Sequence, residues 1–61
     1  MNVLNYRAEG VKNIEVYNSL GQKLKAEKAV GSVNTSALPK GSYILKLISE
    51  NGAVSTKKFI K

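Results

Sequence analysis

The sequence predicts an all-β fold, a small antiparallel sandwich or barrel of about six short strands. The first observation is the spacing of the five glycines, which recur at gaps of ten or eleven residues, each in a turn-like context. The second is the alternation of apolar and polar residues within the runs between them, which is typical of half-buried strands. The third is an Asn-Gly dipeptide between two such runs, the strongest short-range signal of a hairpin.

The runs between the glycines are the expected strands. In the second run Ile14 and Val16 alternate with a glutamate, and in the third run Leu24 and Ala26 alternate with charged residues. This period of two predicts that the four apolar side chains face a core. In chain order, the expected strands are Val3–Arg7, Asn13–Asn18, Gln22–Val30, Val33–Ser36, Ser42–Glu50 and Ala53–Ile60.

The third run has an alternative interpretation as a short helix. The segment KLKAEKAV, residues 23–30, is rich in Lys, Leu, Ala and Glu, which all favour a helix. Gly21 and Gly31 bracket the segment closely, and no N-cap residue precedes it. We therefore favour a strand.

The second half of the chain gives the clearest strand and turn signals. Residues Tyr43–Ile48 are apolar at five of six positions, which predicts a central strand with both faces covered. The Asn-Gly pair at residues 51–52 tolerates positive φ at both positions and makes the last two runs antiparallel neighbours. Pro39 and Gly41 stand at the second and fourth positions of an expected type I turn that starts at Leu38.

The composition leaves little for catalysis or metal binding. The 61 residues include no Cys and no His, which excludes disulfides and ordinary zinc sites. There is no Asp, and the four glutamates are scattered, whereas oxygen-ligand metal sites need clustered carboxylates. We therefore expect no enzyme activity, and we predict no catalytic, cofactor-binding or metal-binding residue.

The formal net charge of +6 favours acidic partners. One alternative is a small basic barrel that binds nucleic acid or another polyanion, with Tyr6, Tyr17, Tyr43 and Phe59 as stacking faces. The basic residues are spread over the whole length and include one arginine, Arg7, which weighs against that function. Another alternative is a C-terminal adhesive or carbohydrate-binding sandwich module, which the lack of Trp disfavours.

Three blocks of sequence stand out together: IEVYNSLGQKL, LPKGSYILKL and, at the carboxyl end, KKFIK. In this order they resemble the C-terminal sorting domain of the type IX secretion system (type A, Por secretion system) of Bacteroidetes-type bacteria, and the resemblance covers about residues 3–61. The resemblance implies structural roles for eleven matching residues: Val16, Tyr17, Asn18, Leu20, Gly21, Gln22, Leu38, Pro39, Gly41, Tyr43 and Lys46. The other matching residues are Lys57, Lys58, Phe59, Ile60 and Lys61.

The resemblance implies a single sorting domain over residues 1–61 with an immunoglobulin-like β-sandwich fold. Such a domain is a secretion signal that the outer-membrane translocon recognises and a sortase commonly removes. The implied path takes a cargo protein fused upstream through the periplasm to the cell surface or the extracellular space, without any cofactor or small-molecule substrate. The family's turns place Gly21, Pro39 and Gly41 in structural roles, with Tyr17 and Tyr43 packing the sandwich. The implied contacts with the machinery are Lys57, Lys58, Phe59, Ile60 and Lys61.

One departure from the family pattern concerns the start of the chain. The family usually begins with a Pro-Asn-Pro segment, whereas this chain begins with MNVLNYR. We therefore expect an N-terminally truncated domain that lacks an upstream strand and has an uncovered sheet edge. Such an edge would allow pairing with a second copy of the chain.

Overall fold

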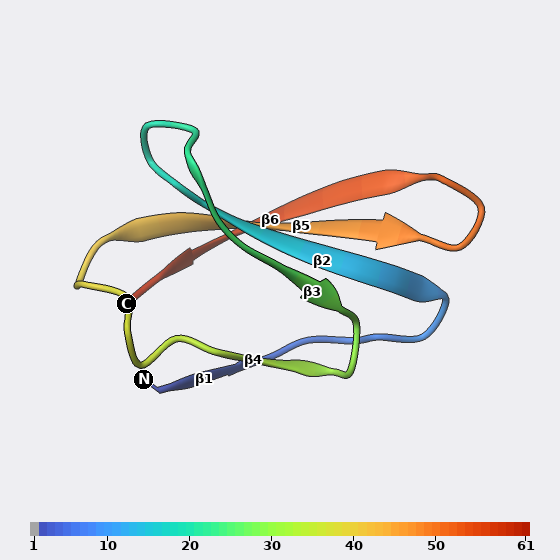
Figure 1. The fold of residues 1–61 in the computed structure, drawn as a ribbon, viewed down its shortest axis with the longest axis horizontal. Helices are drawn as coiled ribbons and strands as arrows, with labels where there is room; N and C mark the ends of the chain where they lie inside the picture. Colours follow the sequence, from blue (N-terminus) through green and yellow to red (C-terminus); the bar gives the residue numbers. More distant parts are fainter. Residues whose placement is uncertain (1) are drawn as a thin grey trace.

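Two antiparallel sheets enclose a small core in the computed structural model, which describes residues 2–61 (Figure 1). The larger sheet has the strand order β3-β2-β5-β6, and β1 pairs with β4 to form the smaller one. All six predicted strands are confirmed, and the helical alternative for residues 23–30 is wrong. The strands are β1 (Val3–Asn5), β2 (Val11–Asn18), β3 (Lys23–Lys28), β4 (Ser32–Asn34), β5 (Ser42–Ser49) and β6 (Val54–Ile60).

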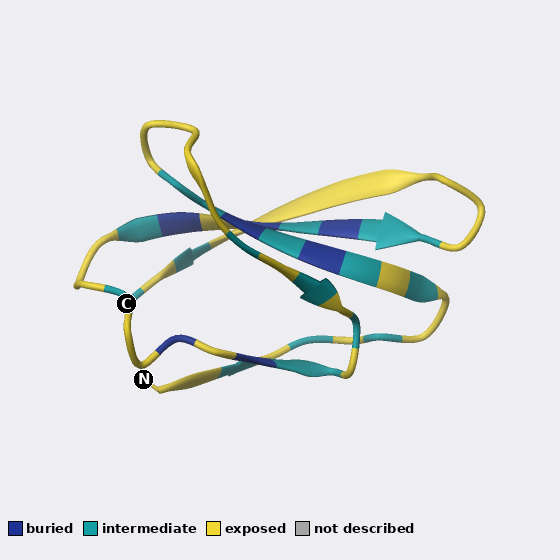
Figure 2. Cartoon of the chain, in the orientation of Figure 1, coloured by how far each residue is buried: buried dark blue, intermediate teal, exposed yellow. Residues whose placement is uncertain are grey.

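The core lies between the β1–β4 sheet and one face of the larger sheet. Figure 2 shows buried residues alternating with less buried ones along β2 and β5. The pleat of a strand places such alternate side chains on one face, which is the face toward the core. β4 contributes one buried residue from the opposite side. The buried apolar side chains are Ile14, Val16, Val33, Tyr43, Leu45 and Leu47.

The other face of the larger sheet, which we call the outer face, has no covering layer among the described strands. β5 lies between β2 and β6, so the prediction of a central strand is confirmed. The prediction that both its faces are covered is wrong, because Ile44 is 39% exposed and Lys46 and Ile48 are half-buried. A small sheet of two strands can cover only one side of β5.

The predicted orientation of β3 is also wrong. Leu24 and Ala26 are exposed, whereas Lys25 and Glu27 lie on the core side. Lys25 stands opposite the buried Val16, and cross-strand partners share a face of the sheet. The Lys25 stem extends beside the core while its ammonium donates to a backbone carbonyl of β4 at 2.9 Å.

The hairpin between β5 and β6 is confirmed, although its turn differs from the one expected. Gly52 has a φ of 87°, while Asn51 keeps a negative φ. The Gly52 N–H donates to the Ser49 carbonyl at 3.0 Å, and the Ser49 N–H donates to the Ala53 carbonyl at 2.8 Å. This is the pattern of a three-residue loop with a left-handed glycine. Asn51 contributes its side-chain oxygen, which accepts the Ala53 N–H at 3.0 Å.

Candidate recognition surface

Three segments that are far apart in the sequence meet at one end of the larger sheet. Asn18 at the end of β2 pairs with Tyr43 at the start of β5, and Tyr43 pairs with Phe59 near the end of β6. Gly41 and Lys61 exchange both backbone hydrogen bonds, at 3.2 and 2.9 Å. Figure 1 shows this end of the molecule opposite the β5–β6 hairpin. We call it the motif end, and it comprises residues 18–22, 38–41 and 58–61.

The turn between β2 and β3 is built by the side chain of Asn18. Its Oδ1 accepts the N–H of Leu20 at 3.0 Å and the N–H of Gln22 at 2.9 Å, and its Nδ2 donates to Gln22 Oε1 at 2.7 Å. Gly21 has a φ of 83°, a conformation that side chains other than glycine's rarely adopt. The backbone and Asn18 therefore define this turn.

The segment between β4 and β5 is a bend and not the predicted type I turn. The Gly41 N–H donates to the carbonyl of Lys61, the residue after β6, and not to the carbonyl of Leu38 as a type I turn would require. The hydrogen-bonded turn lies earlier, at Thr35–Leu38, with a 3.0 Å bond between its ends. The Tyr43 hydroxyl donates to the Pro39 carbonyl, an arrangement like the tyrosine corner of immunoglobulin-type sandwiches. Tyr43 thereby fixes the bend to the core.

Lys61 holds the end of β6 against the loop that follows β4. Its ammonium donates to the carbonyls of Thr35, Ser36 at 3.3 Å and Leu38 at 2.7 Å. Charge-assisted hydrogen bonds of this kind are stronger than neutral ones. Sequence reasoning had no signal for this contact, because the partners stand 23 to 26 residues away and offer only backbone atoms.

The five residues predicted to contact the machinery differ in how far the fold engages them. The Phe59 ring is half-buried and stacks on Tyr43 with ring centroids 5.4 Å apart. Lys61 is bound as described above. The remaining three have exposed side chains: Lys57, Lys58 and Ile60.

β6 is an edge strand, and its register decides which backbone groups are free. In antiparallel pairs, residues that exchange both hydrogen bonds alternate with residues that exchange none. The bonded pair at Gly41 and Lys61 therefore directs the odd-numbered residues of β6 toward β5. The N–H and C=O groups of four even-numbered residues face the open edge: Val54, Thr56, Lys58 and Ile60.

The motif end is basic. Its three segments include Lys40, Lys58 and Lys61 and no Asp or Glu. Two of the glutamates, Glu9 and Glu50, stand next to the β1–β2 turn and the β5–β6 hairpin, at the opposite end. The charges are therefore distributed unevenly along the long axis, which favours an acidic partner at the motif end.

Tyr17 lies on the outer face and not between the sheets. Its hydroxyl donates to Glu15 Oε1 at 2.6 Å, and the ammonium of Lys46 lies 5.9 Å from its ring centroid. Lys23 Nζ is 3.4 Å from Glu15 Oε2, and Lys46 Nζ is 3.7 Å from Glu15 Oε1. The hydrogen bond from Tyr17, followed by the charges of Lys23 and Lys46, lowers the pKa of the Glu15 carboxyl. The same hydrogen bond, with partial burial and the negative charge of Glu15, raises the pKa of Tyr17.

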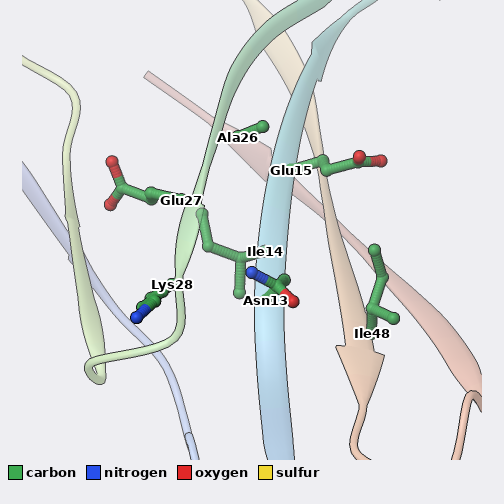
Figure 3. A pocket seen from close by; sticks show the side chains of 7 residues that line it. All are labelled: Asn13, Ile14, Glu15, Ala26, Glu27, Lys28 and Ile48. Atoms are coloured by element: carbon green, nitrogen blue, oxygen red, sulfur yellow. The ribbon is translucent and has the colours of Figure 1, made fainter.

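A shallow, open depression of about 380 Å³ lies over the β2–β3 pair. Figure 3 shows the carboxylates of Glu15 and Glu27 pointing in opposite directions, so they do not converge on one point. Within residues 2–61, no group of three potential metal-ligating side chains occurs, and no helix is long and apolar enough to cross a membrane. The lining residues are Asn13, Ile14, Glu15, Ala26, Glu27, Lys28 and Ile48.

Comparison with known protein families finds a match over almost the whole chain. The family described as secretion system C-terminal sorting domain matches residues 2–61. No curated protein and no solved structure matches the chain.

Proposed function

The chain belongs to the family of secretion system C-terminal sorting domains, and on this premise we propose that strand β6 is the part that the secretion machinery recognises. As a member of this family, the chain is a C-terminal sorting signal of the type IX secretion system. Such a signal directs its cargo across the outer membrane to the cell surface or the extracellular space. The alternative function, binding of nucleic acid or another polyanion, assumes a closed β-barrel. The larger sheet is open and does not close into a barrel.

The observation that carries the proposal is the free edge of β6. Its outward-facing N–H and C=O groups can pair with an added strand of a partner, and this main-chain pairing supplies affinity. The exposed side chains of Lys57, Lys58 and Ile60 then supply specificity. Because both lysines are free of internal partners in the described hydrogen bonds and ion pairs, an acidic partner can bind them without breaking the fold.

Phe59 and Lys61 act in this proposal by holding β6 in place. Their side chains contact Tyr43 and the carbonyls of the loop after β4. Deletion of residues 57–61 would therefore remove the recognition groups and also destabilise the fold. Single side-chain changes at exposed positions separate the two effects.

The partners follow from the family and the open edge. The proposed reader is the outer-membrane translocon, which receives the folded domain and its cargo from the periplasm, and the sortase then cleaves upstream of the domain. The domain itself performs no catalysis and takes no cofactor or small-molecule substrate. Before a partner binds, the same edge can pair with a second copy of the chain.

The test fuses the chain to the C-terminus of an exported reporter in a host with type IX secretion. In K57Q/K58Q two exposed lysines of β6 lose their charge, and K12Q/K28Q is the control because it removes the same charge from exposed lysines elsewhere. We expect the unmodified chain and the control to reach the medium and K57Q/K58Q to accumulate in the periplasm. Equal secretion of the two double variants would overturn the role of the β6 lysines.

A further inference from the structure

Leu20 is the most exposed large hydrophobic side chain among the described residues. It stands at the tip of the β2–β3 turn and is 82% exposed. It does not belong to the core or to the partly buried residues that pack against the core. The fold therefore gains no burial of apolar surface from this side chain.

The turn does not need a leucine for its own structure. The side chain of Asn18 and the left-handed backbone of Gly21 fix it, and Leu20 contributes only its backbone N–H. A turn held by three hydrogen bonds to or from one side chain presents its tip in a restricted conformation. Such preorganisation lowers the entropy cost of binding.

The surroundings of Leu20 favour a partner with acidic groups. The motif end includes the exposed Lys40 and Lys58, whereas Lys23, at the start of β3, is already paired with Glu15 at 3.4 Å. Ile60, also at the motif end, is 70% exposed. An exposed aliphatic tip at an end of the sheet whose segments hold exposed lysines and no Asp or Glu is complementary to an apolar pocket with an acidic rim.

We propose that Leu20 is an anchor that inserts into an apolar, acid-rimmed pocket on a protein subunit of the type IX machinery. This inference rests on the proposed function and extends the contact surface from β6 to the β2–β3 turn. A shaped protein pocket fits the observations better than a lipid surface, because a single aliphatic side chain on a rigid turn gives little membrane affinity. Truncation of a central apolar anchor usually weakens a protein complex about tenfold or more.

The experiment compares three variants of the chain fused to the exported reporter. L20S removes the anchor, L20M keeps an apolar side chain, and V30S is the matched control because Val30 is 74% exposed but lies outside the motif end. We expect L20S to slow the appearance of the reporter in the medium about tenfold, and L20M and V30S to leave the rate within about twofold. Equal rates for L20S and V30S would overturn the inference.

Two further measurements keep the outcomes distinguishable. The urea midpoint of L20S should equal that of the unmodified chain, and a large decrease would assign Leu20 a folding role and overturn the proposal. Binding to anionic phospholipid vesicles should not depend on Leu20; vesicle binding that is lost in L20S would indicate lipid insertion instead. If the unmodified chain is not secreted, the sorting function itself fails, whereas secretion of all the variants refutes only the anchor.

Discussion

The ammonium nitrogen of Lys61 lies 2.7 Å from the carbonyl oxygen of Leu38, 23 residues earlier in the chain. The same ammonium also donates to Thr35 and Ser36, so one side chain satisfies several carbonyls of the loop after β4. A lysine that composition alone assigns to surface charge therefore has a structural role. In contrast, Lys57 and Lys58 are exposed and make no side-chain hydrogen bond or ion pair among the described contacts.

Replacement of Lys61 by Met should destabilise the domain. K61M keeps most of the stem but leaves the loop carbonyls without their charged donor, which should cost about 1–3 kcal/mol of unfolding free energy. Urea unfolding followed by circular dichroism measures the change. The control K58M alters an exposed lysine of β6 and should stay within about 0.5 kcal/mol. Similar values for both variants would contradict the structural role of Lys61.

Replacement of Tyr43 by Phe should also be destabilising, although the ring remains. Y43F keeps the stacking on Phe59 but removes the hydroxyl that donates to the Pro39 carbonyl. The expected loss is about 1 kcal/mol, because a partly buried hydrogen bond that fixes the bend is removed. Y6F is the control, since it removes a hydroxyl whose hydrogen bond, from the Val30 N–H, is exposed. Thermal unfolding should give a clearly lower midpoint for Y43F than for Y6F.

The stability of the domain should depend on the ionisation of Glu15. Its folded-state pKa lies below the ordinary 4.5, first because of the hydrogen bond from Tyr17 and then because of Lys23 and Lys46. A lowered folded pKa contributes stability above pH 4.5, and this contribution is lost as the pH falls through the folded value. In Y17F the pKa of Glu15 should move up toward 4.5. Titration of the Glu15 carboxyl carbon by NMR measures this shift, and an unchanged pKa would contradict the assignment.

The two faces of β5 should respond very differently to truncation. L45A opens a cavity in the core and should cost about 2–5 kcal/mol. I44A affects the uncovered outer face, where Ile44 already contacts solvent, and should cost about 1 kcal/mol or less. Urea unfolding of both variants measures the difference in unfolding free energy, and their midpoints are directly comparable when the slopes of the two unfolding curves (m-values) are equal. Equal losses would mean that a further layer covers the outer face in solution.

Proline substitutions on β6 should separate folding from recognition. The Thr56 N–H faces the open edge, so T56P keeps the bonds to β5 but blocks strand addition at that point. The Ser55 N–H faces β5, so S55P removes a ladder bond and should unfold the hairpin. We expect T56P to fold, by circular dichroism, and to be retained in the periplasm. Normal secretion of T56P would contradict strand addition.

Much of the fold could be predicted because alternation and turn chemistry are local signals. Ile14 and Val16 face the core as their period of two predicts. Which side of β3 faces the core could not be predicted. Alternation shows that Leu24 and Lys25 lie on opposite sides of the strand, but it does not show which side packs on the core. Which of the two faces the core depends on pairing with β2, where the register shifts between Val16 and Tyr17.

The candidate recognition surface was only partly visible in the sequence. The three motif blocks were found, but their convergence depends on β2 and β6 both pairing with β5. Leu20 was expected to be structural because it belongs to a family motif, whereas its side chain is exposed. Exposure at a turn tip is a property of the folded chain, and no residue pattern in the turn distinguishes the two roles.

Backbone groups of β6 point alternately toward β5 and toward the open edge, and this alternation limits insertions and deletions in the strand. One set of backbone groups bonds to β5, and the interleaved set, at Thr56 and Lys58 among others, faces the open edge. Inserting or deleting one residue near Ser55 would exchange the two sets and move the Phe59 ring to the outer face. Substitutions along β6 change one contact at a time, whereas a frame change of one residue alters every contact together. We therefore expect natural variants of this strand to differ in residue type far more than in residue number.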